Sequence, residues 1–198
     1  VIQEEAEEDI RLMAGVGGED VSDTTVDTVK SRVPWLVVNL VTAVLVSLVI
    51  GLFNATIEQM VALAVLMPIV ASMGGNAGAQ TMTVTVRALA MRELDGGRLR
   101  RLIRREMVVG VVNGVIFAVL IGIVTAVRYG DVQLGIVIGM AMVINMIVAG
   151  TFGILVPLAL DKLKADPAIA SAVFVTTITD VIGFFAFLGI AGLWFGLF

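Results

Sequence analysis

The sequence of 198 residues contains no cysteine and no histidine. The absence of cysteine excludes disulfide bonds and thiolate metal ligands, and the absence of histidine excludes imidazole ligands and a histidine proton relay. The serine–histidine and cysteine–histidine pairs of many hydrolases are excluded for the same reason. Metal binding in this chain must therefore rely mainly on oxygen ligands.

Polar residues are also few, since 59% of the residues are hydrophobic and the mean hydropathy is +1.03. A soluble domain of this length needs more polar surface than that. Five apolar runs are long enough to cross a hydrocarbon layer of ~30 Å, and they are too many and too long for a signal peptide. They cover residues 35–53, 59–89, 107–127, 132–160 and 168–197. The sequence thus predicts an all-α, polytopic membrane protein with five transmembrane helices.

The positive residues indicate how these helices are oriented. Lys30 and Arg32 precede the first run, six arginines lie between the second and third, and Lys162 and Lys164 lie between the fourth and fifth. The opposite loops hold only Arg128. Because lysine and arginine stay on the cytoplasmic side, we expect a cytoplasmic N-terminus and a C-terminus outside. Topology and contact with the lipid bilayer explain the run "RLRRLIRR", and no nucleic-acid partner is expected.

The residues before the first run are acidic and divide into two segments. Residues 1–18 resemble the tail of a soluble domain followed by a glycine-marked linker, and we expect the chain to be a fragment whose upstream part is missing. Residues 19–33 are expected to form a connecting helix capped by Ser22 and ended by Pro34. Its residues alone favour an interfacial linker, and a helix at the cytoplasmic mouth of a membrane path is the alternative. Residues 34–198 form the predicted five-span membrane domain.

One ionisable residue lies deep inside an apolar run. Asp180 is about 11 residues into the fifth run, or roughly 17 Å, which is close to the midplane of the membrane. An ionisable group at this depth is costly unless it faces a partner or water, so Asp180 is a functional candidate. Thr176 lies one turn earlier, with Thr177 and Thr179 to the sides, and Gly183 lies one turn later. The alternative is an aspartate that only bonds a neighbouring helix.

The second run is interrupted by the polar passage "ASMGGNAGAQTMTV" at residues 71–84. Helical spacing places one polar stripe along this run, at Ser72, Asn76, Gln80, Thr83 and Arg87. Pro68 and the glycines Gly74, Gly75 and Gly78 expose backbone carbonyls, which are tolerated at membrane depth where they line a cavity or are buried in protein. The passage predicts a lined path, and a packing seam of Gly74 and Gly78 is the alternative.

One carboxylate with amides, hydroxyls and carbonyls is a donor set for hard cations such as Mg²⁺, Ca²⁺ or Mn²⁺. Mg²⁺ gives up its water reluctantly, so a site with few charges and many dipoles fits a largely hydrated Mg²⁺. A single aspartate cannot neutralise a divalent ion, whereas a two-fold dimer would place two Asp180 side chains around one axis. The sequence therefore predicts a divalent cation as cargo and a homodimer as the assembly.

Two other functions compete with passive conduction, namely coupled transport and catalysis. A divalent cation entering down the membrane potential gains about 2 × 2.3 kcal/mol per 100 mV, so passive conduction suffices for uptake. A proton-coupled divalent cation carrier that uses Asp180 as the titrating group is the alternative. An enzyme is not expected, because an intramembrane aspartyl protease needs two carboxylates and a rhomboid-type protease needs a histidine.

The segments "LMPIVASMGGNAGAQTMTVTVRALAMREL" and "VTTITDVIGFFAFLGIAG" resemble the membrane domain of the MgtE magnesium channels. The resemblance implies a homodimer in the bacterial inner (plasma) membrane, with a Mg²⁺-selective pore at the dimer interface lined by spans two and five. It also implies a missing N-terminal cytoplasmic regulatory part ending in CBS domains, of which residues 1–18 would be the tail. The choice among Mg²⁺, Mn²⁺ and Co²⁺ stays open.

The same resemblance assigns residues to the pore. It implies that Asp180, Asn76, Gly75 and Thr176 hold the metal ion. The residues expected to line the pore around them are Ser72, Gly74, Gly78, Ala79, Gln80, Thr83, Thr177 and Thr179. Many family members carry a polar residue where this chain has Ala79, so the resemblance does not specify how the water shell of the ion is held at that level.

Overall fold

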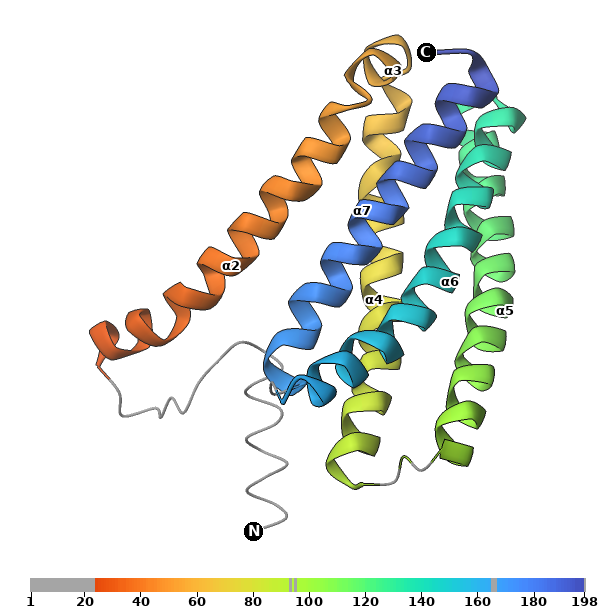
Figure 1. Ribbon diagram of the computed structural model, residues 1–198. Helices are drawn as coiled ribbons and strands as arrows, with labels where there is room; N and C mark the ends of the chain where they lie inside the picture. The colour runs from red at the N-terminus through yellow and green to blue at the C-terminus, as the bar shows by residue number, and fades with distance from the viewer. Residues whose placement is uncertain (1–23, 93, 95, 165–166, 198) are drawn as a thin grey trace.

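The computed structural model describes residues 24–92, 94, 96–164 and 167–197, and all regular structure among them is helical (Figure 1). Five helices are long and apolar enough to cross a membrane, which confirms the predicted fold class for the described residues. The helices are α2 (Thr25–Gly51), the short α3 (Asn54–Gln59), α4 (Ala62–Ala90), α5 (Gly96–Tyr129), α6 (Val132–Lys162) and α7 (Pro167–Phe195).

The expected end of a separate connecting helix at Pro34 is wrong. Helix α2 begins at Thr25, is capped by Thr24 instead of Ser22, and continues through Pro34 to Gly51. The proline removes one backbone hydrogen bond, and a bend absorbs this loss: Figure 1 shows α2 changing direction near its N-terminal end. An unbroken helix is favoured because lipid offers the backbone no other hydrogen-bond partners. Ser22 itself lies outside the described residues.

The basic segment between the second and third spans is helical and not a loop. Helix α5 begins at Gly96, so Arg98 and the arginines that follow it lie on its first turns. Arginine and leucine are good helix formers, which favours the extension of this helix beyond the apolar run. The actual connection from α4 is only a few residues long.

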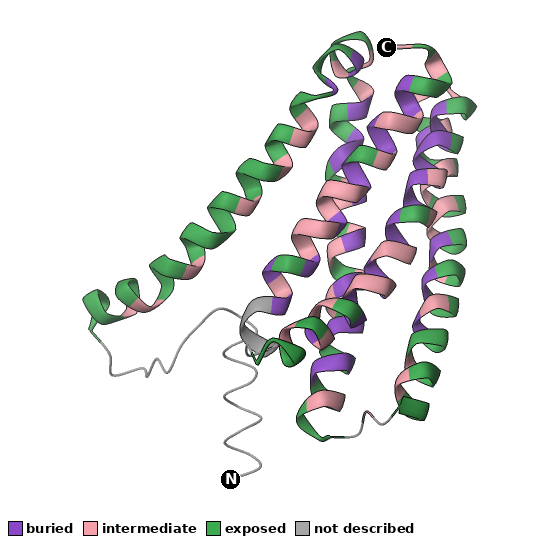
Figure 2. Ribbon diagram, in the orientation of Figure 1, coloured by how far each residue is buried: buried purple, intermediate pink, exposed green. Residues whose placement is uncertain are grey.

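Helix α6 is the centre of the bundle. It packs against α4, α5 and α7, and α4 also packs against α7. Figure 2 shows buried residues along the facing sides of these helices. Much of the apolar core lies between α3, α4, α6 and α7, where Phe53 also meets Phe185 edge to face with ring centres 5.5 Å apart.

Glycines allow α5 and α6 to approach closely. A Cβ atom added at Gly110 would lie 3.0 Å from the backbone oxygen of Met146, and one at Gly139 would lie 3.3 Å from that of Ala118. A side chain at either position would require the neighbouring backbone to shift. The Gly110/Gly114 and Gly135/Gly139 pairs therefore lie in the packing seam between α5 and α6.

Helix α2 stands away from the rest of the bundle (Figure 1). None of its residues is buried, and its contact with the core is made by Val46 and Ile50 near its C-terminal end. Its main packing partner within the described chain is α7. The spans α4, α5, α6 and α7 thus form the packed unit that positions the candidate site, and the remaining span, α2, lies at the side of this unit.

Candidate functional site

The polar stripe predicted in the second span exists on α4. This helix stays continuous through Pro68 and the glycine-rich passage. The stripe residues Ser72, Asn76, Gln80, Thr83 and Arg87 are all exposed in the single chain. The Asn76 amide donates to the Ser72 hydroxyl oxygen at 3.4 Å, and the Thr83 hydroxyl donates to the Ala79 carbonyl at 2.8 Å. One face of α4 therefore presents amide and hydroxyl groups that no other described element covers.

Helix α7 lies directly against the glycine-rich part of α4. A Cβ atom at Gly75 would be 3.8 Å from Cγ2 of Thr176, and one at Gly78 would be 2.6 Å from Cγ1 of Val175. Gly75 is half-buried beside this contact, whereas Gly78 is buried inside it. The structure thus brings together two of the four residues that were expected to hold the ion, Gly75 and Thr176.

Asp180 lies at the middle of α7, 13 residues after its first residue and 15 before its last. Gly75 has the same position in α4, 13 residues after Ala62 and 15 before Ala90. The two helices run in opposite directions (Figure 1), so their midpoints are at the same level of the bundle. Asp180 is half-buried, and within the described residues no hydrogen bond or ion pair reaches its carboxylate.

The threonines around Asp180 satisfy their hydroxyl protons within their own helix. Thr176 donates to the Ala172 carbonyl at 2.9 Å, and Thr177 donates to the Val173 carbonyl at 2.6 Å. Each hydroxyl oxygen then keeps lone pairs that can face a cation or its water shell. The level of Asp180 therefore offers one carboxylate and several neutral oxygen donors.

Three of the residues expected to line the pore are buried within the chain. Gly74 and Gly78 are covered by neighbouring helices, and Thr179 has no exposed surface and donates to the Thr176 carbonyl at 2.9 Å. Ala79 and Thr177 are half-buried. For Gly74 and Gly78 the structure supplies a packing role, and pore lining by these residues stays a prediction.

Asn145 of α6 packs between α4 and α7 at the level of the candidate site. This residue was not identified from the sequence. Its side chain has no exposed surface, and its amide donates to the Val70 carbonyl on α4 at 2.8 Å. A Cβ atom at Gly74 would overlap this amide, and one at Gly183 on α7 would lie 2.8 Å from its Nδ2 atom. Asn145 is thus inserted between the two helices that carry the stripe and Asp180. The signal in the sequence is an amide near the middle of the apolar run at residues 132–160.

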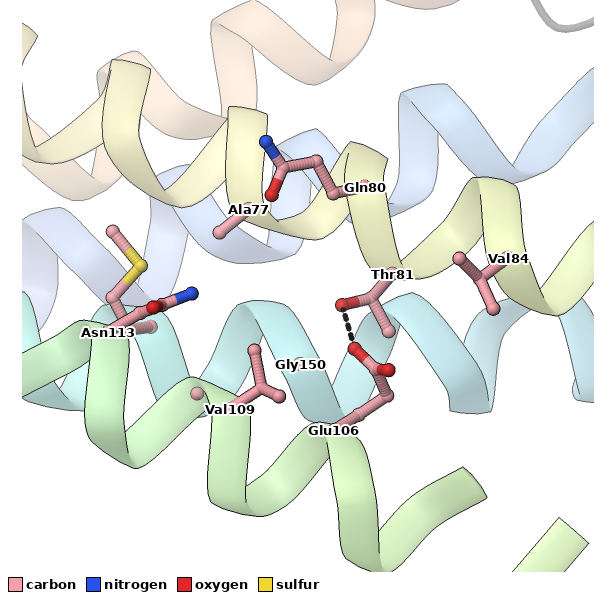
Figure 3. A pocket seen from close by; sticks show the side chains of 10 residues that line it. Ala77, Gln80, Thr81, Val84, Glu106, Val109, Asn113 and Gly150 are labelled. Carbon is pink, nitrogen blue, oxygen red and sulfur yellow. Dashed lines mark hydrogen bonds between the residues drawn. The ribbon is translucent and has the colours of Figure 1, made fainter. Parts of the chain in front are cut away.

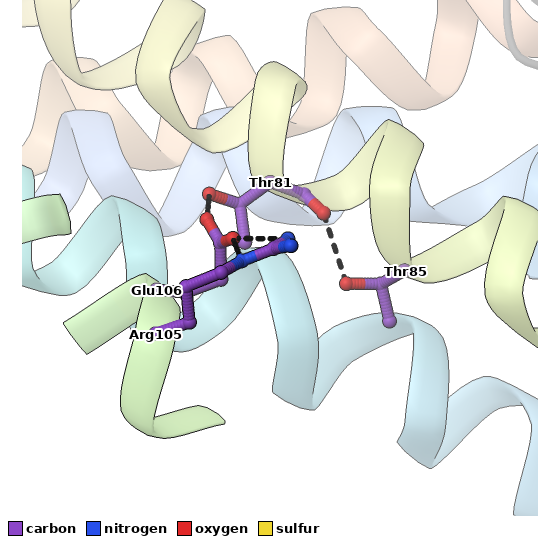
Figure 4. Close-up of polar contacts among 4 residues, drawn as sticks. All are labelled: Thr81, Thr85, Arg105 and Glu106. Atoms are coloured by element: carbon purple, nitrogen blue, oxygen red, sulfur yellow. Dashed lines mark hydrogen bonds and ion pairs between the residues drawn. The ribbon is translucent and has the colours of Figure 1, made fainter. Parts of the chain in front are cut away.

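Glu106 of α5 is a second buried carboxylate that sequence analysis missed. It is 8% exposed, its Oε2 atom accepts from the Thr81 hydroxyl on α4 at 2.9 Å, and its Oε1 atom accepts from the Arg105 guanidinium at 2.8 Å (Figure 4). A spacing of four residues puts Glu106 on the same face as Gly110 and Gly114, so the glycine seam could have revealed it.

The Glu106 carboxylate borders a small cavity between α4, α5 and α6 (Figure 3). The volume of this cavity is about 120 Å³. Its lining includes the amides of Gln80 and Asn113. Both carboxylate oxygens of Glu106 are already bonded, so this group serves to join α4 to α5.

No group of three or more acidic residues that could hold a metal ion occurs within the described part of the chain. A cation at the level of Asp180 would therefore meet one carboxylate per chain and otherwise only dipoles. Such a site fits an ion that keeps most of its water, because the direct ligands available are few.

Comparison with known proteins gives a consistent result. The sequence profile described as "MgtE: Divalent cation transporter" matches residues 67–190, which include the stripe and Asp180. Proteins named "Magnesium transporter MgtE" from Enterococcus faecalis, Bacillus subtilis and Thermus thermophilus are 36%, 35% and 34% identical, over 98%, 96% and 98% of this chain. The chain spans 43% of the length of each of these relatives.

The relatives are named as transporters, and the five apolar helices are those of a multi-pass membrane protein. The matched region contains both elements of the candidate site, the glycine-rich passage of α4 and the centre of α7. The chain belongs to the MgtE family of divalent cation transporters.

Proposed function

We propose that this chain forms the pore of a Mg²⁺ channel in a bacterial inner membrane, with α4 and α7 of two copies around a shared axis. The observation that carries the proposal is the exposed polar stripe of α4 at the level of an unpaired carboxylate on α7. Exposure of a polar face of this length to lipid costs free energy, whereas contact with water or with a second copy of the chain is favourable.

The proposed ion path follows from the donor chemistry. Asp180 supplies the charge, Thr176 and Asn76 supply neutral oxygen atoms, and the small Gly75 lets a hydrated ion approach the α4 backbone. Two copies would place two carboxylates at one level, which balances the charge of one divalent ion. A hydrated cation held by few direct ligands can also leave the site, as conduction requires.

The proposed specificity follows from the same features. With no thiolate or imidazole in the chain, the site disfavours soft metals such as Cu⁺. Ca²⁺ takes six to eight oxygen ligands and prefers more carboxylates than one per chain, whereas Mg²⁺ keeps several waters. Mg²⁺ is therefore the proposed cargo, and Mn²⁺ and Co²⁺ are tested as competitors.

The experiment is Mg²⁺ flux into liposomes that contain the purified chain, with Asp180→Asn as the test variant. We expect the variant to fold and to lose most of the flux, because the substitution removes the charge and keeps the shape. The matched control is Asp131→Asn, since Asp131 caps α6 through the amides of Gln133 and Leu134 and asparagine caps equally well. This control should conduct as the original chain does.

Flux through Asp180→Asn at the original rate would overturn the assignment of this residue. A second arm imposes a pH gradient across the liposomes. Passive conduction predicts the same Mg²⁺ flux with and without the gradient at equal membrane potential, whereas a proton-coupled carrier requires a flux that follows the gradient.

A further inference from the structure

The first turns of α5 carry a group of arginines that the proposed pore does not use. Arg100, Arg101 and Arg104 are exposed and, with Gly97, line a hollow of about 480 Å³. Among the residues that the structure describes, no hydrogen bond or ion pair reaches these three guanidinium groups. Arg105 differs, because a carboxylate already pairs with it at 2.8 Å. Within the part of the chain that the structure describes, positive charge without a paired carboxylate therefore surrounds the hollow.

The helix face that carries these arginines continues as an apolar surface. Val108, Val115 and Val119 follow Arg104 on the same side, with 56%, 52% and 55% of their surface exposed. The 15 residues from Arg104 to Val119 cover about 22 Å, which exceeds half of the ~30 Å hydrocarbon layer. The arginines thus lie at one end of this exposed apolar face, which is where lipid headgroups are expected if the face lies in the hydrocarbon layer.

We propose that this hollow binds the phosphate group of an anionic phospholipid whose acyl chains lie along the exposed valines of α5. Arginine suits this role because its planar fork donates two parallel hydrogen bonds to a phosphate. The adjoining apolar face favours a lipid over a free phosphate ion, since a free ion would use only the charged half of the surface. This site includes neither Asp180 nor any residue of the polar stripe, so the inference is independent of the proposed pore.

The test measures lipid retention by the purified chain in a mild detergent with native mass spectrometry. Phosphatidylglycerol, phosphatidylcholine and inorganic phosphate are added separately. Each arginine near an anionic headgroup is worth about a fivefold change in affinity, so three arginines predict a preference for phosphatidylglycerol on the order of a hundredfold. The triple variant Arg100→Gln, Arg101→Gln, Arg104→Gln should bind both lipids equally and should still fold, because all three side chains are exposed.

Two controls separate a built site from general attraction. Arg128→Gln removes an exposed arginine at the other end of α5, where the guanidinium lies 5.7 Å from the centre of the Tyr129 ring, and should leave retention unchanged. Replacing the three arginines by lysine keeps the charge and removes the fork, so retention should fall only in part.

Equal retention of the two lipids by the original chain would overturn the proposal. The same holds for unchanged phosphatidylglycerol retention in the glutamine variant. Displacement of the lipid by inorganic phosphate at the same concentration would also overturn it, in favour of a site for the bare anion.

Discussion

Two buried polar side chains fix α4, and each does so by one short contact. Asn145 fits between the glycines of α4 and α7 and donates to Val70 at 2.8 Å, while Glu106 holds Thr81 at 2.9 Å. Because the hydrocarbon layer contains no water that could bond an unsatisfied polar group, each contact favours one arrangement of the helices. The rotation of α4, and with it the direction of the polar stripe, is set at these two levels.

Substitution of Glu106 tests the hydrogen bond between Thr81 and Glu106. Glu106→Leu leaves the Thr81 hydroxyl without an acceptor, and we expect it to lower the free energy of unfolding by about 1–3 kcal/mol. Glu106→Gln keeps an oxygen that Thr81 can donate to, and it loses only the pair with Arg105. Because Arg105 is 58% exposed, that loss should stay below about 1 kcal/mol.

The measurement for the Glu106 variants is unfolding in detergent micelles, followed by circular dichroism. Thr81→Val serves as the partner variant and should cost as much as Glu106→Leu, with little added cost when the two are combined. Independent, additive costs would show that the hydrogen bond does not stabilise the bundle.

At the scale of helices, composition predicted most of the fold. Rules that hold for backbone exposed to water gave the wrong result for two segments. The five spans followed from length and hydropathy, because lipid demands about 20 apolar residues with internal hydrogen bonds. Pro34 and the arginine-rich segment were assigned as helix end and loop by rules that hold for exposed backbone. Glu106 and Asn145 escaped prediction because their partners come from other helices, which a single sequence does not align.

Two adjacent glycines of α4 test the contact with its neighbours. Gly74→Ala places a methyl group on the Asn145 amide, and we expect a loss of about 1–3 kcal/mol in unfolding free energy. Gly75→Ala meets only Cγ2 of Thr176 at an ordinary contact distance of 3.8 Å, so it should be neutral or stabilise by up to about 1 kcal/mol.

Unfolding of the two alanine variants is measured under identical detergent conditions. Because the positions are neighbours on one helix, intrinsic helix propensity cancels between them. Equal stability of the variants would contradict the insertion of Asn145 between α4 and α7.

For the whole molecule, the proposed pore makes one chain half of the assembly, with the exposed stripe of α4 turned toward the second copy. The absence of cysteine makes this easy to examine, since any introduced thiol is the only one present. If two copies meet across the stripe, Asn76 of one copy lies near Asn76 of the other. The exposed valine side of α5 should instead face lipid.

We therefore expect Asn76→Cys to form covalent dimers with a short bis-maleimide in membranes, and Val119→Cys to remain monomeric. Val119 is a suitable control because it is 55% exposed and lies on a different helix. The products are separated on a denaturing gel. Dimers from the Val119→Cys variant alone would place the interface on α5 and remove the basis for a shared pore at α4.

The isolated position of α2 bears on how the chain is synthesised. Its main packing partner, α7, is synthesised after the other described helices, and 144 residues separate Gly51 from Phe195. At 5–20 residues per second, α2 waits about 7–29 s in the membrane before that partner exists. No charged residue occurs between Trp35 and Gly51, and no residue of α2 is buried. We therefore expect helix α2 to be stable in lipid without a packing partner, and the four later spans to assemble without it.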